Sequence, residues 1–131
     1  MDERGNPVKT RIMLVDDEES IRMIGKMMLE RLDYEAITVS GGCEAVTIYQ
    51  EQSGSIDLVI LDLTMPQMDG EQTYHELIRI NPSARIIISS GYYAQDMASV
   101  FSSGGRVGFI QKPFTLNELA DKIQTMLTIN S

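Results

Sequence analysis

The 131-residue chain is poor in cysteine and histidine, with one residue of each, Cys43 and His75. A single cysteine excludes an intrachain disulfide and a cluster of thiolate metal ligands. It is also typical of a reducing compartment, so we expect a cytoplasmic protein. Long hydrophobic runs are missing too, because apolar stretches such as residues 86–88 fall far short of the roughly 20 residues that span a bilayer. No apolar stretch follows the charged start of the chain, so we expect neither membrane insertion nor a signal peptide.

Basic residues are outnumbered by acidic ones. Eleven Lys and Arg against nineteen Asp and Glu give a net charge of −8. A nucleic-acid backbone attracts the opposite charge, so direct nucleic-acid binding is not expected. The first apolar run is followed by neither a dinucleotide-binding glycine fingerprint nor a phosphate-binding loop. The composition and motifs therefore argue against a nucleic-acid, flavin or dinucleotide binder.

The length and composition predict a single domain. A chain of 131 residues lies within the roughly 100–200 residues of one domain, and 43% hydrophobic residues supply a core without disulfides or a structural metal. We place the domain at residues 10–128, with a flexible N-terminal lead-in at 1–9 and a C-terminal tail at 129–131.

Short runs rich in β-branched residues alternate with stretches whose apolar residues recur at helical spacing. The runs predict five strands, at residues 12–15, 36–39, 58–61, 86–88 and 108–110. Four of them are almost continuously apolar, as in parallel strands covered on both faces, and the second alternates, as at a sheet edge. Five helices are expected after the strands, the fourth around residues 97–101. This alternation predicts an α/β fold with a helix layer on each side of one parallel sheet.

Capping motifs mark the expected helix ends. Thr115 with Glu118 forms a capping box at the last helix, and Asp69 with Gln72 resembles one at the third. The third helix is expected to stop at Asn81, because a proline follows it.

Acidic residues follow two of the buried strands. Asp16 and Asp17 end the first and Asp62 ends the third, and a parallel sheet that changes direction between these strands brings the three carboxylates together. Two such charges about 4 Å apart repel by roughly 4 kcal/mol at an effective dielectric near 20. The cluster must therefore take up protons or bind a cation, and a hard divalent cation is the natural answer. Oxygen-only ligands favour Mg²⁺, with Mn²⁺ as a substitute.

The other strand ends supply a cation and a hydroxyl. Lys112 follows the fifth strand as a point positive charge, and Ser90 ends the fourth. With a metal ion beside them, these groups would allow Asp62 to attack phosphorus, and the product would be an aspartyl phosphate. Taken alone, Lys112 fits an ordinary surface lysine equally well, and only the acidic cluster favours the functional interpretation. His75 lies apart from this pattern and is expected to have no role, and Cys43 is expected to have no redox function.

The segments VDDEES, LDLTMPQMDG, SSG and FIQKPF occur at successive strand ends. In this order they resemble the motifs of response-regulator receiver domains, and the resemblance covers roughly residues 10 to 127. It implies a flavodoxin-like (βα)5 three-layer sandwich whose five-stranded parallel sheet has the order 2-1-3-4-5.

The resemblance also implies a role for each site residue. Asp62 would be the phosphoacceptor, Asp17 a direct Mg²⁺ ligand and Asp16 a partner of the ion through water. The backbone carbonyl of Thr64 would be another metal ligand, and Lys112 would contact the phosphoryl group. The bond between Lys112 and Pro113 would be cis. Ser90 and Phe109 would be the switch residues. Family members more often carry tyrosine where Phe109 stands, so a hydrogen bond from that side chain to a partner is lost.

The implied function is a phosphorylation-activated switch of a two-component phosphorelay. The phosphoryl group would come from a phosphohistidine of a sensor histidine kinase or a histidine phosphotransfer protein, and the face of the fourth helix, fifth strand and fifth helix would shift. Such a domain catalyses only its own phosphorylation and dephosphorylation. The FIQKPF and SSGY segments resemble receivers of hybrid sensor kinases more than those joined to DNA-binding domains. We therefore expect either an excised module of such a kinase or a stand-alone receiver without an effector domain.

Two alternatives remain. The first is a small-molecule phosphohydrolase with an aspartyl-phosphate intermediate, but one common family of that kind needs a second aspartate two residues after the nucleophile, and here that residue is Thr64. The second is a degenerate receiver that only binds partners, although no expected acidic residue or lysine is missing. The oligomeric state stays open between a monomer and a weak dimer. Nine methionines, several on the first helix, are expected to give adaptable core packing, with some facing a partner.

Overall fold

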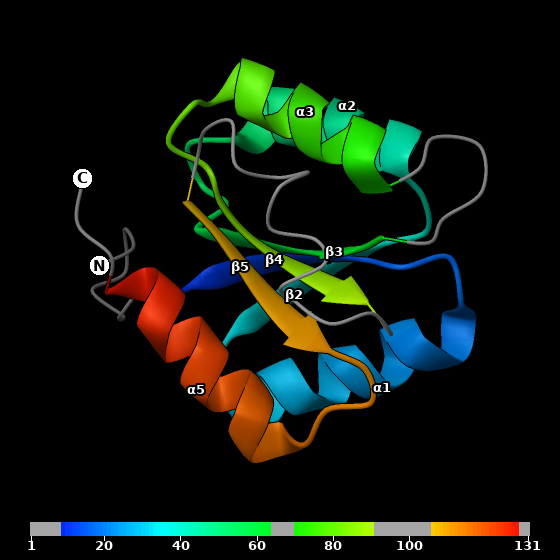
Figure 1. The fold of residues 1–131 in the computed structure, drawn as a ribbon, viewed down its shortest axis with the longest axis vertical. Coiled ribbons are helices and arrows are strands. Elements are labelled where there is room, and N and C mark those ends of the chain that lie inside the picture. Colours follow the sequence, from blue (N-terminus) through cyan, green and yellow to red (C-terminus); the bar gives the residue numbers. More distant parts are fainter. Residues whose placement is uncertain (1–8, 64–69, 91–105, 129–131) are drawn as a thin grey trace, which may run out of the picture.

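The computed structural model describes residues 9–63, 70–90 and 106–128, and these form one parallel sheet between two helix layers (Figure 1). The elements are β1 (Arg11–Val15), α1 (Glu19–Arg31), β2 (Glu35–Val39), α2 (Gly42–Gln52), β3 (Leu58–Asp62), α3 (Gly70–Ile80), β4 (Arg85–Ser90), β5 (Arg106–Gln111) and α5 (Leu116–Leu127). All five predicted strands are present, and each extends no more than two residues beyond the predicted bounds at either end. The helix expected around residues 97–101 lies outside the described residues. The proposed domain boundaries stay a prediction.

The strand order is β2-β1-β3-β4-β5, and every neighbouring pair is parallel. The expected order and fold class are therefore confirmed. β3 lies at the centre and is buried along its whole length, whereas β2 is an edge strand with exposed residues among its five. The continuous apolar pattern of β3 thus correctly predicted a buried strand, and the alternating pattern of β2 correctly predicted an edge strand.

Alternate strand residues divide the core into two halves. On β1, Met13 and Val15 pack in the half that contains residues of α2 and α3, while Ile12 and Leu14 pack in the half that contains residues of α1 and α5. Figure 1 shows the two helix pairs on opposite faces of the sheet. Because side chains alternate along a strand, one short apolar run serves both layers at once.

The helix ends follow the predicted chemistry where the structure describes them. Thr115 and Glu118 form both bonds of the capping box: the Thr115 amide donates to Glu118 Oε1 at 2.8 Å, and the Glu118 amide donates to Thr115 Oγ1 at 3.1 Å. α3 ends at Ile80, directly before Asn81, as expected. The predicted cap at Asp69 lies outside the described residues. Within the described part of the chain, no helix combines the length and apolar character needed to cross a membrane.

Candidate functional site

The carboxyl ends of β1, β3, β4 and β5 carry the polar residues that the sequence singled out. Asp16 directly follows β1, Asp62 and Ser90 are the last residues of β3 and β4, and Lys112 directly follows β5. The strand register places Asp62 opposite Ser89 on the neighbouring strand. Because parallel strands all end at the same edge of the sheet, residues far apart in sequence meet there.

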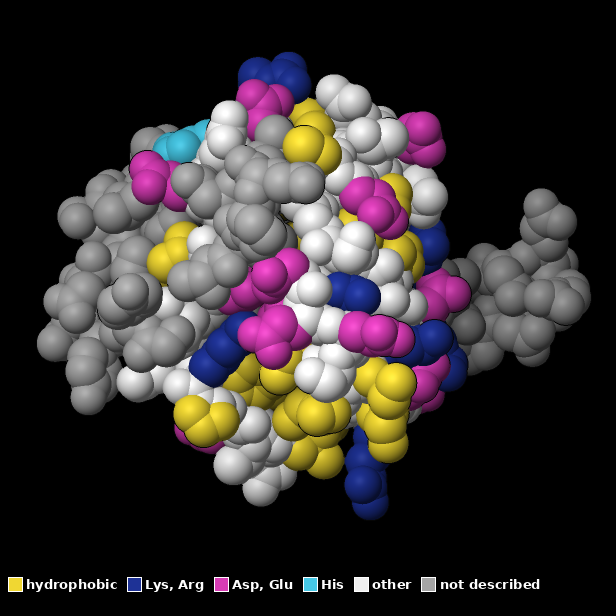
Figure 2. Space-filling view, turned by 90° about the vertical axis from the view of Figure 1, so that its right-hand side faces the viewer, with side chains coloured by type: hydrophobic (Ala, Val, Ile, Leu, Met, Phe, Trp, Pro, Cys, Tyr) yellow, Lys and Arg dark blue, Asp and Glu magenta, His cyan; other side chains and the backbone are white. Residues whose placement is uncertain are grey.

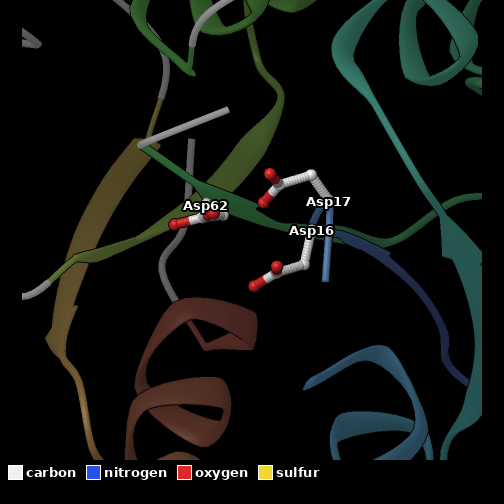
Figure 3. Close-up of side chains that lie close together, drawn as sticks. All are labelled: Asp16, Asp17 and Asp62. Atoms are coloured by element: carbon white, nitrogen blue, oxygen red, sulfur yellow. The ribbon is translucent and has the colours of Figure 1, made fainter. Parts of the chain in front are cut away.

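The structure brings the three predicted acids together (Figure 3). Asp16, Asp17 and Asp62 each offer a carboxylate oxygen, and these oxygens all lie within 4.8 Å of one another. Asp16 and Asp62 are only 2% and 3% exposed, whereas Asp17 is exposed. Two carboxylates at this separation repel by roughly 3 to 4 kcal/mol at an effective dielectric near 20. The cluster therefore needs a neighbouring positive charge.

Lys112 supplies part of that charge. Its Nζ lies 3.0 Å from Asp16 Oδ2 and 3.0 Å from Asp62 Oδ1, and its side chain is 27% exposed. Burial lowers the pKa of Lys112, but the hydrogen bonds and charges of the two carboxylates outweigh burial, so the pKa is raised above its ordinary value. Lys112 is thus a cation at neutral pH, and the three acids and Lys112 together keep two negative charges. That residual charge and the oxygen-only donors fit a hard divalent cation.

Asp16 is fixed in the site by hydrogen bonds to both its backbone and its side chain. Its amide donates to the carbonyl of Val39, and its Oδ1 accepts from the amide of Glu18 at 3.0 Å. Its Oδ2 accepts from Lys112, and its carbonyl accepts from Arg22 Nη1 at 2.7 Å. Both carboxylate oxygens of Asp16 are therefore already engaged, which suits the indirect, water-mediated role that the resemblance implies.

The contacts of Glu18 and Arg22 with Asp16 could not be predicted from the sequence. A backbone amide donates whatever its side chain is, so the Glu18 contact has no signature in the sequence. The Arg22 contact is made to a backbone carbonyl six residues earlier, and only the fold shows that the side chain turns back over this loop.

The predicted switch residues lie on the neighbouring strands β4 and β5. Ser90 is buried at the end of β4, and Phe109 of β5 is half-buried against the core half of α2 and α3. Ile88 packs in the same core half, so Ser90, two residues further along β4, is on the face of the sheet that Phe109 also occupies. The bond between Lys112 and Pro113 is cis, as the resemblance implied. Thr64 lies outside the described residues, so its predicted carbonyl contact stays a prediction.

Gly70 packs directly against the backbone that carries Asp62. Its amide donates to the carbonyl of Leu63 at 3.1 Å. A Cβ at this position would lie 2.5 Å from Leu63 Cα and 2.7 Å from the carbonyl oxygen of Asp62. Backbone atoms cannot give way as a flexible side chain can, so only glycine fits here.

We expect Gly70→Ala to destabilise the fold by about 1 to 3 kcal/mol, the range typical of overpacking. Urea unfolding followed by circular dichroism measures the change. Gly54→Ala is the matched control, because a Cβ at Gly54 meets no atom within 4 Å, and its effect is expected to stay within about 1 kcal/mol. Equal unfolding midpoints for the two variants would contradict the packing argument.

An apolar surface adjoins the acidic cluster. A hollow of about 280 Å³ is lined by Asp16 and Lys112 together with apolar residues that include Ile24 and Phe114. Next to it, α1 exposes Met23, Ile24 and Met27, each by more than half. In Figure 2, hydrophobic side chains gather beside acidic and basic ones on this face of the molecule. The prediction that methionines pack in the core is confirmed for Met13 and Met126, which are buried. Met23 and Met27 of α1 are exposed instead.

Comparison with known proteins identifies the family. The response regulator receiver domain model matches residues 12–124, so the chain belongs to the response regulator receiver domain family. Among its relatives, the chemotaxis protein CheY of Bacillus subtilis is 36% identical over 118 residues, covering 89% of this chain and 97% of that protein. The sensor kinase CckA of Brucella abortus is 35% identical over 116 residues, which cover 88% of this chain but only 12% of the kinase.

A solved structure has the same fold. The crystal structure of a complex of CheX, CheY, BeF3 and Mg²⁺ from Borrelia burgdorferi contains a chain that matches with a TM-score of 0.82 at 25% identity. The match covers 92% of this chain and 90% of that one. Receiver domains are signalling domains of two-component systems, and this is the class of protein that the fold and the family define.

Proposed function

We propose that this receiver domain is a phosphorylation-dependent switch of a cytoplasmic phosphorelay, with Asp62 as the phosphoacceptor. The observation that carries the proposal is the contact of Lys112 with both Asp62 and Asp16, beside the exposed carboxylate of Asp17. These groups combine a nucleophile, a cation for phosphoryl oxygens and donors for a metal ion in one place. The donor would be a phosphohistidine of a sensor histidine kinase or a histidine phosphotransfer protein.

In the proposed reaction, an Asp62 carboxylate oxygen forms a bond to phosphorus while the bond between phosphorus and the donor imidazole nitrogen breaks. The electron pair of the broken bond stays on that nitrogen, and the product is an aspartyl phosphate. Lys112 lies 3.0 Å from Asp62 Oδ1, within reach of a phosphoryl oxygen attached there, and its second contact to Asp16 keeps the ammonium at the site. Asp62 thus acts as the nucleophile and Lys112 stabilises the transferred charge.

The residues that would hold Mg²⁺ are Asp17 and Asp62 directly, Asp16 through water, and the carbonyl of Thr64. The clustered carboxylate oxygens of Asp16, Asp17 and Asp62 support this assignment, as does the Mg²⁺ in the structure of the CheX–CheY complex. Mn²⁺ would substitute, because it accepts the same oxygen ligands. When bound, the ion spreads the negative charge that develops on the phosphoryl oxygens.

The switch would use Ser90 and Phe109. The two residues lie on neighbouring strands, on the same face of the sheet. Phe109 pairs with Ile88, and Ser90 comes two residues after Ile88. We propose that phosphorylation shifts a pre-existing equilibrium of these side chains and of the face formed by the expected fourth helix, β5 and α5. Phe109 would signal through burial alone, because it has no phenolic oxygen.

Incubation with acetyl phosphate tests the proposed function. Mass spectrometry is expected to show one added phosphoryl group in the presence of Mg²⁺ and none after addition of a chelator. Mn²⁺ is expected to restore the adduct. An adduct that forms equally well with the chelator present would overturn the metal-dependent mechanism.

We further propose that the phosphohistidine protein docks on the exposed apolar face of α1 beside the acidic cluster. Ile24 is 55% exposed and lines the hollow that reaches Lys112, so a partner seated there would approach Asp62. Ile24→Glu places a charge in this contact. The donor in this test is a sensor kinase that phosphorylates the wild-type chain. We expect Ile24→Glu to slow transfer from it by about tenfold, which corresponds to a loss of roughly 1.4 kcal/mol of interface energy.

The control reaction is phosphorylation of Ile24→Glu by acetyl phosphate, which needs no docking and is expected to proceed at the wild-type rate. Gln50→Glu is the control variant, because it adds the same charge at an exposed position of α2, on the opposite side of the sheet. If both variants accept phosphate from the kinase equally fast, the docking face lies elsewhere.

A further inference from the structure

Arg22, in the first turns of α1, connects this helix to the loop that carries the acids. Its Nη1 donates a 2.7 Å hydrogen bond to the backbone carbonyl of Asp16, and its amide donates to the carbonyl of Glu18 at 3.0 Å. Arg22 is half-buried, and its hydrogen bond to the Asp16 carbonyl is only partly exposed to water. The contact therefore joins the helix to the backbone just beyond the last residue of β1.

The carbonyl of Asp16 belongs to the peptide group that links Asp16 to Asp17. Clamping that carbonyl restricts the plane of the peptide and hence the direction in which the next side chain leaves the backbone. Asp17 is exposed, whereas Asp16 is buried and has both carboxylate oxygens engaged. The place of the Asp17 carboxylate in the cluster thus depends chiefly on how its backbone is held.

We propose that Arg22 is a positioning residue for the metal site, holding the peptide between Asp16 and Asp17 so that the Asp17 carboxylate stays close to Asp62. This inference rests on the proposed function, in which these acids bind Mg²⁺. In this role Arg22 would act through the backbone and would touch neither the phosphoryl group nor the ion. Groups that orient metal ligands typically change metal affinity by 10- to 100-fold when they are removed.

The positive charge of Arg22 has the opposite effect on metal binding. A guanidinium near the site repels a cation, and loss of a partly exposed charge would tighten Mg²⁺ binding by a few-fold. The positioning effect is the larger of the two. Arg22→Met, which keeps an apolar stem but loses the donor and the charge, is therefore expected to weaken Mg²⁺ binding by about tenfold.

Isothermal titration calorimetry of MgCl₂ into the full chain, at constant ionic strength, measures this effect. Arg22→Lys keeps a donor and the charge, and its Mg²⁺ affinity is expected to return to within about threefold of wild type. Lys26→Met is the matched control, because it removes a positive charge one turn further along α1, at an exposed residue, and is expected to bind Mg²⁺ as the wild type does or slightly more tightly.

The amide resonances give a second readout without metal. The ¹⁵N shift of Asp17 reports on the same peptide group, so we expect it to move in Arg22→Met, to recover in Arg22→Lys and to stay unchanged in Lys26→Met. This comparison also shows that each variant is folded.

The sign of the affinity change decides the inference. Mg²⁺ affinity that is unchanged or higher in Arg22→Met would show that Arg22 contributes only charge and would overturn the positioning role. A wild-type chain that binds no Mg²⁺ would instead overturn the proposed metal site, and the inference with it.

Discussion

Asp62→Asn is expected to lower phosphorylation by acetyl phosphate by 10³-fold or more, an order-of-magnitude figure typical of removing a nucleophile. The amide is nearly the same size as the carboxylate, but it is neutral and a poor nucleophile. Mass spectrometry of the intact chain over a time course, with Mg²⁺ present, measures the loss. We expect the melting temperature to equal or exceed that of the wild type, because Asn at this position relieves repulsion within the acidic cluster.

Asp57→Asn is the matched control for this experiment. Asp57 directly precedes β3, so it lies at the opposite end of the strand that Asp62 terminates, and its Oδ2 accepts a hydrogen bond from the Arg11 amide. The variant is expected to be phosphorylated as fast as the wild type. A phosphoryl adduct that forms undiminished in Asp62→Asn would show that another side chain is the phosphoacceptor.

Lys112→Met is expected to reduce phosphorylation by acetyl phosphate by about 10²- to 10³-fold, the range seen when one group that stabilises transition-state charge is removed. The ammonium contacts Asp62 directly, so its loss leaves the transferred phosphoryl group without that cation. Mg²⁺ binding is expected to be unchanged or up to roughly tenfold tighter, because Lys112 competes with the metal for the same carboxylates.

The same substitution is expected to destabilise the metal-free fold by about 1 to 2 kcal/mol. Asp16 and Asp62 are buried and lose their cation, although Lys112 is 27% exposed and the cost is smaller than for a fully buried pair. Saturating Mg²⁺ is expected to restore most of the loss. Urea unfolding with and without Mg²⁺ measures both effects.

Lys9→Met provides the control for Lys112→Met. Lys9 pairs with Asp33 at 3.2 Å, but both side chains are largely exposed and far from the strand ends that form the site. Lys9→Met is expected to be phosphorylated at the wild-type rate, and its free energy of unfolding is expected to stay within about 0.5 kcal/mol of the wild-type value. If Lys112→Met were phosphorylated at the wild-type rate, Lys112 would not stabilise the transferred phosphoryl group.

The sequence alone was enough to predict most of the strands and several helix ends of this protein. The apolar runs located all five strands, and the alternating pattern at β2 predicted an edge strand. The capping box at Thr115 and the stop before Pro82 predicted helix ends correctly. These features are local, because burial pattern and capping depend on residues only a few positions apart. The acids at strand ends were also identifiable, since polar residues directly after buried strands are conspicuous in any parallel sheet.

Only the tertiary structure decided how these residues meet. It places one ammonium between Asp16 and Asp62, turns Arg22 back onto the Asp16 carbonyl, and leaves Met23 and Met27 in solvent while Met13 and Met126 are buried. Such facts depend on packing between segments up to 96 residues apart and on bonds to backbone atoms, which every residue type possesses. The sequence therefore determined which groups are available at the carboxyl ends of the strands. The pairing of β5 with β4 and the packing of α1 against the sheet decided which of these groups touch.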